Sequence, residues 1–229
     1  MQKEIKVSVI IRAYNAEGTI ERAVESVLMQ DFPRDSFEIV VVDDGSTDAT
    51  VERLGAYKSL AGFRLIRQSN KGAVPAANSG LREARGKYVV LLDSDDVLGP
   101  ELLKEEVMCL EYNPDTDFVY SDYFEKKGEA VIIVSTENIF HTIAIGIMFR
   151  RKKFEAIGFY DEALKFAEYD LLLRTWEAWH GMRIAKPLFT YIRREKSITG
   201  NSRWVDEAFE ELRKLHPNHL KEIKTIRTY

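Results

Sequence analysis

Cysteine is almost absent from this chain of 229 residues, because Cys109 is the only one. A single cysteine excludes a disulfide within the chain, and it argues against a structural zinc site, since such sites usually take several thiolates. A protein without disulfides is at home in a reducing compartment. We therefore expect a cytoplasmic protein.

Long apolar runs are absent as well. No segment approaches the roughly 20 apolar residues that cross a bilayer. Charged residues also stand at Lys3, Glu4 and Lys6, where a secretion signal would lead into an apolar segment. We expect neither a membrane anchor nor a secretion signal.

The charges show no strong excess of one sign, because 33 Lys and Arg residues face 37 Asp and Glu residues, for a formal net charge of -4. This balance gives no electrostatic reason to expect nucleic-acid binding. The local basic excess runs from Arg213 to Arg227 and includes Lys214, Lys221 and Lys224. It predicts either a solvated terminal helix or peripheral contact with the inner face of a membrane.

The hydrophobic content of 45% is enough for the core of one large domain. In the first hundred residues, apolar strand patterns alternate with amphipathic helix patterns. We expect strands at 6–11, 38–42, 63–67 and 87–92, and helices at 19–30, 47–60 and 76–84. This alternation predicts an α/β fold with a mostly parallel, Rossmann-like central sheet flanked by helices.

The regular alternation ends after Pro100. From there we expect a helix to about 112, a polar hairpin at 126–129, strands at 117–121, 144–149 and 187–193, and helices at 152–157 and 168–180. The last helix has an apolar face that we expect to point inward, formed by Leu171, Leu172, Thr175 and Trp176. No linker or repeat separates this half from the first, so we expect one domain.

An acidic cluster follows the strand predicted at 87–92, with carboxylates at Asp93, Asp95 and Asp96. Such a cluster repels itself unless a cation holds it, and carboxylates are the hard oxygen ligands that Mg²⁺ and Mn²⁺ prefer. The alternative is ordinary turn and capping chemistry, for which Asp and Ser are favoured residues. Context has to decide between the two.

Three polar loops follow predicted parallel strands, at residues 12–15, 43–48 and 93–96. In open α/β sheets the ligand lies beyond the carboxyl ends of the strands. We therefore expect the three loops to meet in one crevice, and this convergence favours a functional reading of the acidic cluster.

Several motifs occur in order along the chain: Val-Ser-Val-Ile-Ile-Arg-Ala-Tyr-Asn at 7–15, Val-Val-Val-Asp-Asp-Gly-Ser-Thr-Asp at 40–48, Asn-Lys-Gly at 70–72, Ala-Asn-Ser-Gly at 77–80 and Leu-Asp-Ser-Asp-Asp at 92–96. Together they closely resemble the family 2 glycosyltransferases. The segments 149–158, 160–162 and 167–171 extend the resemblance to about residue 200.

The resemblance implies a GT-A fold and inverting transfer from a nucleotide diphosphate sugar, assisted by Mn²⁺ or Mg²⁺. It implies a nucleotide-sugar binding half at 1–99, an acceptor-side half at 100–205 and a helical tail at 206–229. The acceptor would be a glycan, glycolipid or glycoprotein. By position, Asp95 is the chief metal ligand, Asp93 reaches the donor ribose or the metal, and Asp96 orients the metal or the sugar.

The resemblance also implies a nucleotide site. Tyr14 matches a position that stacks on the base, and Asp44 one that accepts a hydrogen bond from a base nitrogen, which suits uracil. Gly72 lies near the donor or simply forms a turn. Arg12, where relatives often carry Thr or Pro, pairs with phosphate or the base, or faces solvent.

The sequence departs from the family pattern where relatives commonly carry Ala-Arg-Asn, because this chain has Ala76-Ala77-Asn78. Arg12, Lys71 or Arg82 would replace the missing arginine, or the nucleotide selectivity differs. The Gln-x-x-Arg-Trp motif of processive relatives is incomplete as well, because Gly200 precedes Arg203 and Trp204 where Gln belongs. We therefore expect transfer of a single sugar.

An inverting transfer needs a general base. Relatives place it in a Glu-Asp pair at a helix start, which here reads Ala167-Glu168, so Glu168 is the first candidate and Asp170 the second. Alternatively, both carboxylates only stabilise the helix through a favourable interaction with the positive N-terminal end of its dipole. Trp176 and Trp179 form either a sugar-stacking platform or part of the core.

Two other functions remain open at this point. One is a catalytically inactive relative that binds a nucleotide sugar or a partner protein. The other is a sugar nucleotidyltransferase, which should carry a glycine-rich loop after the first strand, and residues 13–18 do not supply one.

Overall fold

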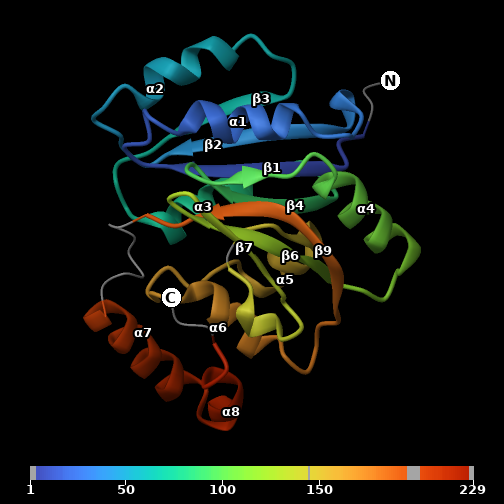
Figure 1. Cartoon of the computed structure of the whole chain (residues 1–229), viewed down its shortest axis with the longest axis vertical. Coiled ribbons are helices and arrows are strands. Elements are labelled where there is room, and N and C mark those ends of the chain that lie inside the picture. The colour runs from blue at the N-terminus through green and yellow to red at the C-terminus, as the bar shows by residue number, and fades with distance from the viewer. Residues whose placement is uncertain (1–3, 144, 195–201, 227–229) are drawn as a thin grey trace.

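One mixed β-sheet forms the centre of the molecule in the computed structural model, which describes residues 4–143, 145–194 and 202–226 (Figure 1). Its first part is four parallel strands in the order β3-β2-β1-β4. Their bounds are β1 Val7–Ala13, β2 Phe37–Asp43, β3 Phe63–Arg67 and β4 Tyr88–Asp93. The predicted α/β fold with a mostly parallel first half is confirmed.

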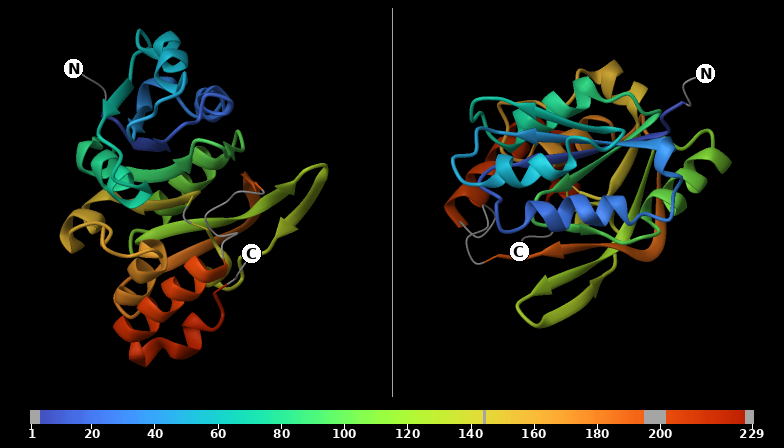
Figure 2. Two further views of the ribbon diagram at one scale, coloured as in Figure 1. Left: turned by 90° about the vertical axis from the view of Figure 1, so that its left-hand side faces the viewer. Right: turned by 90° about the horizontal axis from the view of Figure 1, so that it is seen from above.

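The sheet continues beyond β4 in the order β8-β6-β9-β5, and β7 pairs with β6. The bounds are β5 Val97–Leu98, β6 Phe118–Lys127, β7 Ala130–Val134, β8 Ile147–Arg150 and β9 Gly181–Ile192. β8 runs antiparallel to both β4 and β6, while β6 and β9 are parallel. The hairpin of β6 and β7 extends away from the body of the molecule (Figure 2).

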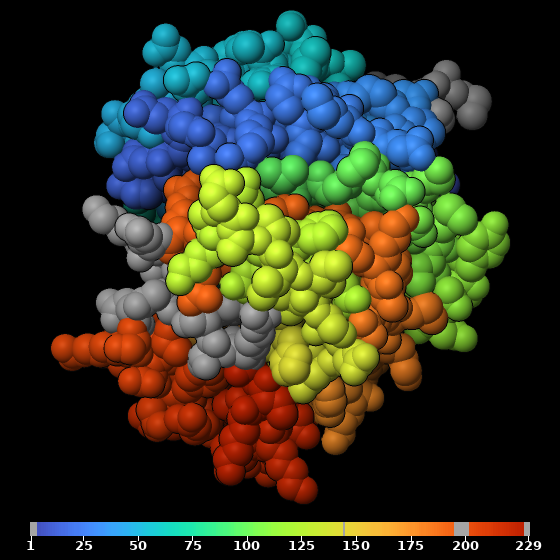
Figure 3. Space-filling view, in the orientation of Figure 1, coloured from blue at the N-terminus to red at the C-terminus, as the bar shows by residue number. Residues whose placement is uncertain are grey.

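Helices cover both faces of the sheet. Their bounds are α1 Ile20–Leu28, α2 Thr50–Arg53, α3 Ala73–Glu83, α4 Leu102–Tyr112, α5 Arg151–Ile157, α6 Ala167–Arg174, α7 Ser202–Leu215 and α8 Leu220–Ile223. In the space-filling view, the red helices α7 and α8 form the lower end of the molecule (Figure 3). None of the helices among the described residues is both long and apolar enough to cross a bilayer.

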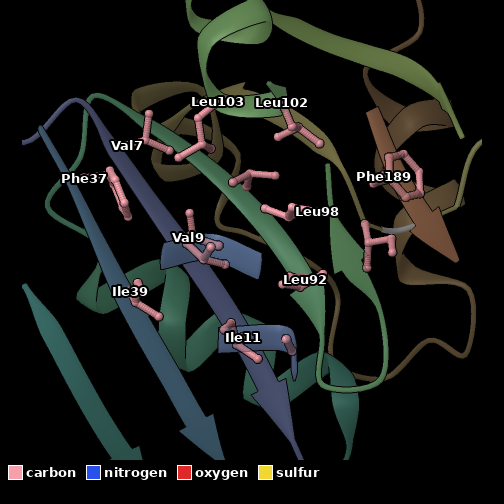
Figure 4. Packing of buried hydrophobic residues seen from close by; sticks show 14 of the residues in the cluster. Val7, Val9, Ile11, Phe37, Ile39, Leu92, Leu98, Leu102, Leu103 and Phe189 are labelled. Atoms are coloured by element: carbon pink, nitrogen blue, oxygen red, sulfur yellow. The ribbon is translucent and has the colours of Figure 1, made fainter. Parts of the chain in front are cut away.

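Two apolar cores lie on opposite faces of the sheet, because successive strand residues point to opposite sides. Val9, Ile11 and Ile39 pack with α1 and α4 in the first core (Figure 4). Ile10 and Val40 face the other way and pack with α3, α5, α6 and α7. The second core therefore joins the C-terminal helices to the nucleotide-binding half predicted from the sequence.

The helix predicted at 47–60 is wrong in extent. Only Thr50–Arg53 is α-helical, and a 3₁₀ turn follows at Leu54–Tyr57. Leu54 and Tyr57 are both buried, and their spacing of three matches the period of a 3₁₀ helix. Burial of these two side chains outweighs the propensity for a longer α-helix.

The helix predicted at 168–180 ends at Arg174. Thr175 is buried as predicted and donates its hydroxyl to the Leu171 carbonyl oxygen at 2.7 Å. Trp176 does not point inward as predicted, because 42% of it is exposed, although its ring stacks on Phe140. The turn after Arg174 rotates this indole out of the apolar stripe.

The basic C-terminal segment is described as far as residue 226. Its basic residues lie at the end of α7, on α8 and just after α8, and Arg213 pairs with Glu210 at 2.7 Å. Arg227 lies outside the described residues, as do Gly200 and the expected strand residue at 144. Contact between this segment and a membrane stays a prediction.

Candidate functional site

A pocket of about 830 Å³ opens beyond the carboxyl ends of β1, β2 and β4. Its first wall consists of Arg12 to Tyr14, Asp44, residues 70–76 and Asp93 to Asp95. The expected convergence of three polar loops on one crevice is thus confirmed. Both halves of the chain build the pocket, because its second wall is lined by Thr142, Ile143, Ile145, Ile147, Phe149, Tyr160, Glu162, Leu164, Lys165, Phe166, Glu168, Tyr169, Leu171, Leu172, Tyr191, Ile192, Arg194, Trp204 and Val205.

The acidic cluster stands at the end of β4. Asp93, Asp95 and Asp96 each offer a carboxylate oxygen, and these three atoms lie within 4.8 Å of one another. Asp93 and Asp95 line the pocket. Asp96 is 1% exposed, and its Oδ1 accepts a hydrogen bond from the backbone N–H of Ile192 at 2.7 Å. Asp96 thereby ties the cluster to β9.

The carboxylates of the cluster disfavour each other's ionised form. Burial and the charges of Asp93 and Asp95 raise the pKa of Asp96 to about 9. Burial and Asp93 also raise the pKa of Asp95, against the opposing effect of Arg194. A divalent cation would remove this repulsion, and the donor atoms are the hard oxygens that Mg²⁺ and Mn²⁺ take. These residues fit such an ion.

Arg12 connects the acidic cluster to the opposite wall of the pocket. Its Nε and Nη2 donate to the two carboxylate oxygens of Asp93, the second at 3.2 Å, and its Nη1 donates to Glu168 Oε1 at 3.3 Å. The Arg12 side chain is 10% exposed. Although burial acts to lower the pKa of the guanidinium, Asp93 and Glu168 raise it overall, so Arg12 stays charged. The reading in which Arg12 faces solvent is wrong.

Glu168 and Asp170 lie on different sides of α6. Glu168 lines the pocket, whereas Asp170 is not among its lining residues. The carboxylate of Asp170 pairs with His216 Nε2 at 2.8 Å and with Arg174 Nε at 3.2 Å. Residues two apart on a helix point about 200° apart. The structure therefore places one of the two candidate bases at the pocket and the other in the contact between α6 and α7.

Asp44 holds in place the loop with Lys71 and Gly72, which belongs to the first wall of the pocket. Its Oδ1 accepts from Gln68 Nε2 at 2.7 Å and from the Lys71 N–H at 2.9 Å, while its Oδ2 accepts from the Gly72 N–H at 2.8 Å. Gly72 has a φ of +102°, which favours glycine. Because a carboxylate oxygen has two lone pairs, Oδ2 retains one acceptor position for a ligand. Tyr14 is 50% exposed at the same wall, which leaves its ring available for stacking.

The three substitutes proposed for the missing arginine lie in different settings. Lys71 is exposed and lines the pocket, whereas Arg12 lines it but is paired with two carboxylates. Arg82 pairs with Glu162 at 3.1 Å and is not a lining residue. Lys71 is therefore the best placed of the three to meet a phosphate.

Asn78 is a residue whose role sequence reasoning missed. It is fully buried in α3, donates through Nδ2 to the Tyr160 carbonyl oxygen at 2.9 Å and accepts from the Tyr160 N–H at 3.1 Å. It thereby fixes the segment that carries Tyr160 and Glu162 against α3. The Ala-Asn-Ser-Gly motif that contains Asn78 was the available signal.

The two tryptophans considered as a sugar platform do not line the pocket. Trp179 packs against Phe149 and Phe154, and Trp176 stacks on Phe140. Trp204 from α7 does line it, as do Tyr191 and Arg194 near the end of β9. Trp204 belongs to the incomplete Gln-x-x-Arg-Trp motif, whereas no sequence signal marked Tyr191 or Arg194.

A family model described as glycosyl transferase family 2 matches residues 8–170. Among curated relatives, the poly(ribitol-phosphate) beta-N-acetylglucosaminyltransferase TarS of Staphylococcus aureus is 37% identical over 103 residues, which are 44% of this chain and 18% of TarS. The uncharacterized glycosyltransferase YibD of Escherichia coli is 34% identical over 142 residues, which are 61% of this chain and 41% of YibD. The chain thus spans less than half the length of either relative.

Two solved structures share the fold. Residues 1–349 of TarS in complex with UDP-GlcNAc superpose with a TM-score of 0.76 at 25% identity, covering 92% of this chain and 65% of that one. The mannosyltransferase PcManGT of Pyrobaculum calidifontis, in complex with GDP-Man and Mn²⁺, gives a TM-score of 0.74 at 21% identity, covering 93% of this chain and 65% of that one. At 21% identity, the similarity to PcManGT is evidence for a shared fold alone. The predicted GT-A arrangement is confirmed.

Proposed function

The chain belongs to glycosyl transferase family 2, and on this premise we propose that it moves one sugar from a UDP-sugar to an acceptor hydroxyl, with inversion and with help from a divalent metal. The product would be part of a polysaccharide, glycolipid or glycoprotein glycan. One observation carries the proposal. The acidic cluster and Glu168 lie on two sides of one pocket and are linked through Arg12.

The first wall suits a nucleotide. Tyr14 would stack on the base, and the open acceptor position on Asp44 Oδ2 would take the N–H that uracil presents. TarS, which is similar to this chain, has been solved with UDP and with UDP-GlcNAc, and this supports a uridine nucleotide. Gly72 would let the backbone approach the donor closely.

The acidic cluster suits the diphosphate. Asp93, Asp95 and Asp96 would hold Mn²⁺ or Mg²⁺, chiefly through Asp95, and the ion would supply Lewis-acid stabilisation of the charge that develops on the leaving nucleoside diphosphate. Arg194, whose Nε lies 2.9 Å from Asp95 Oδ2, and Lys71 would add positive charge near the phosphates.

In this proposal Glu168 acts as the general base. Its Oε1 is held by Arg12 Nη1, so we assign Oε2 to accept the proton of the acceptor hydroxyl. Arg12 fixes the position of Glu168 relative to Asp93, and therefore relative to the donor. We propose that residues 1–99 bind the donor and 100–205 the acceptor. The tail predicted from residue 206 would begin inside α7, which spans that boundary.

Titration of UDP, GDP and dTDP with and without Mn²⁺ tests the proposed function. We expect UDP to bind most tightly, and to bind at least about tenfold more tightly with Mn²⁺, because the cluster is self-repelling without a cation. Isothermal calorimetry measures this directly. Metal-independent binding, or no binding of any of the three, would count against the proposal. Release of UDP from UDP-sugars then separates an active enzyme from an inactive nucleotide-binding relative.

Replacement of Arg12 by Met tests the link across the pocket. We expect the Arg12→Met protein to be destabilised by about 1–3 kcal/mol, because loss of Arg12 leaves two partly buried carboxylates without their shared cation. Arg12→Lys should recover part of this loss, since one ammonium cannot reproduce the two-pronged contact with Asp93. Urea unfolding measures the free energy of unfolding, and UDP release measures turnover, which should fall in both variants.

The matched control is Arg53→Met. Arg53 pairs with Glu21 at 2.6 Å, but both side chains are 46% exposed, so its loss should change stability by no more than about 1 kcal/mol. Equal urea midpoints for Arg12→Met and Arg53→Met would contradict the proposed role of Arg12.

A further inference from the structure

The two walls of the pocket differ in chemistry. The first wall carries Arg12, Asp44, Asp93 and Asp95. The second wall presents mainly hydrocarbon, from Ile143, Ile145, Ile147, Leu164, Phe166 and Leu172. Val205 of α7 closes the same side. The pocket is therefore charged where the donor is proposed to bind and apolar on the side of the acceptor.

Three polar side chains on the apolar side, Thr142, Lys165 and Tyr169, are already engaged within the protein. Tyr169 donates its hydroxyl to the Thr142 carbonyl oxygen at 3.1 Å, and Thr142 donates its own hydroxyl to the Ile139 carbonyl oxygen at 2.7 Å. Lys165 Nζ pairs with Glu207 at 3.0 Å and with Glu211 at 3.1 Å. A sugar hydroxyl buried against this wall would lose hydrogen bonds to water without replacement, at a cost in free energy. Hydrocarbon would gain from burial there.

The apolar wall is continuous with the reaction centre. Glu168 is the second residue of α6, and α6 also supplies Leu171 and Leu172 to the apolar wall. Asp95 and Glu168 belong to the same pocket as Ile143 and Leu164. A molecule that presents its hydroxyl to Glu168 can therefore extend into the apolar region without leaving the pocket.

We propose that the acceptor is a lipid-linked saccharide, whose sugar hydroxyl reaches Glu168 while its hydrocarbon chain lies against the second wall. This rests on the proposed function, because it names the acceptor of that same site. A free polysaccharide would present hydroxyls throughout and would not use this wall. The partly buried side chains Ile143, Leu164, Phe166 and Val205 are those that the chain would cover.

Binding of n-alkyl β-D-glucosides tests the proposal. The probes are methyl, butyl, hexyl and octyl glucoside below their micelle concentrations, titrated by calorimetry with and without UDP and Mn²⁺. Each buried methylene should tighten binding up to about fourfold, so hexyl glucoside should bind at least tenfold more tightly than methyl glucoside. Equal affinity for all chain lengths would overturn the proposal.

Two variants locate the effect. Leu164→Asn places an amide on the apolar wall. It should reduce the dependence on chain length, measured as the ratio of the affinities for hexyl and methyl glucoside, at least fivefold. The matched control is Leu215→Asn on α7, where Leu215 is 52% exposed and does not line the pocket. It should leave the dependence unchanged. The same loss in both variants would overturn the proposal, because the alkyl chain would then bind elsewhere.

Val205→Phe provides a second test of where the alkyl chain binds, in case the Leu164→Asn protein does not fold. The larger ring fills the end of the pocket without adding a polar group, so it should weaken octyl glucoside more than butyl glucoside. An unchanged preference for octyl glucoside would contradict the proposed location of the chain. UDP titration without glucoside distinguishes a failure of the proposed function from a failure of the proposed acceptor. Loss of UDP binding with intact chain-length dependence counts against the proposed function alone, and the reverse counts against the acceptor alone.

Discussion

Replacement of Glu168 by Gln is expected to lower turnover by about 10² to 10⁴-fold, the range that a general base usually contributes. Glutamine keeps the shape of the side chain, and its amide oxygen can still accept from Arg12 Nη1, as Glu168 Oε1 does. It cannot take the acceptor proton. Affinity for UDP with Mn²⁺ should therefore stay within about threefold of the unchanged protein. UDP release with a saturating donor and acceptor measures the loss.

Asp170→Asn is the matched control for Glu168→Gln. Asp170 lies two residues further along α6 and pairs with Arg174 and His216. Its loss should destabilise the protein by about 1–3 kcal/mol, because charged hydrogen bonds in a buried contact are weakened, while turnover of the folded protein should change little. If Asp170→Asn abolishes turnover and Glu168→Gln does not, the assignment of the base is wrong.

Replacement of Asp95 by Asn is expected to weaken Mn²⁺-dependent UDP binding by at least about 100-fold, because loss of even an outer partner of a metal ligand commonly costs 10 to 100-fold in metal affinity. Turnover should fall by a similar or larger factor. Without metal, the variant should unfold at the same or a higher temperature than the unchanged protein, because burial and Asp93 already disfavour the Asp95 charge. Calorimetric UDP titration and thermal unfolding measure the two effects.

Asp31→Asn serves as the control for this charge change. Asp31 is exposed, pairs with Lys104 at 2.7 Å and does not line the pocket, so UDP binding and turnover should be unaffected. Should Asp95→Asn keep the full effect of Mn²⁺ on UDP binding, the cluster would not be the metal site. The alternative interpretation, in which these carboxylates serve only as turn and capping residues, would then be correct.

Local residue patterns predicted a large part of the fold and of the first wall. The alternation of strand and helix patterns indicated β1 to β4, and it was clearest for β1, β2 and β4, which are buried on both faces. The loops with Tyr14, Asp44 and Asp93 could be placed together because parallel strands end at one edge of the sheet. The period of an α-helix could also have separated Glu168 from Asp170.

Other features depend on contacts between distant parts of the chain. The partners of Arg12 are Asp93 and Glu168, and the latter lies 156 residues away. A long flexible side chain has many partners within reach, so the sequence left its role open. The exposure of Trp176 and the 3₁₀ turn at Leu54–Tyr57 likewise follow from which side chains find room in the core.

The sequence by itself determined the family resemblance, the α/β class and the motifs that form the first wall, because these depend on short segments and on periods of two and 3.6 residues. The tertiary structure decided which carboxylate of α6 faces the pocket, what holds Arg12, and that the second wall of the pocket is largely apolar. The apolar wall comes from residues that are far apart in the sequence, namely Ile143, Ile145, Ile147, Leu164, Phe166, Leu172 and Val205. In the sequence these apolar residues cannot be distinguished from ordinary core residues. Only the packing of α6 and α7 against the sheet leaves some of them exposed to a pocket.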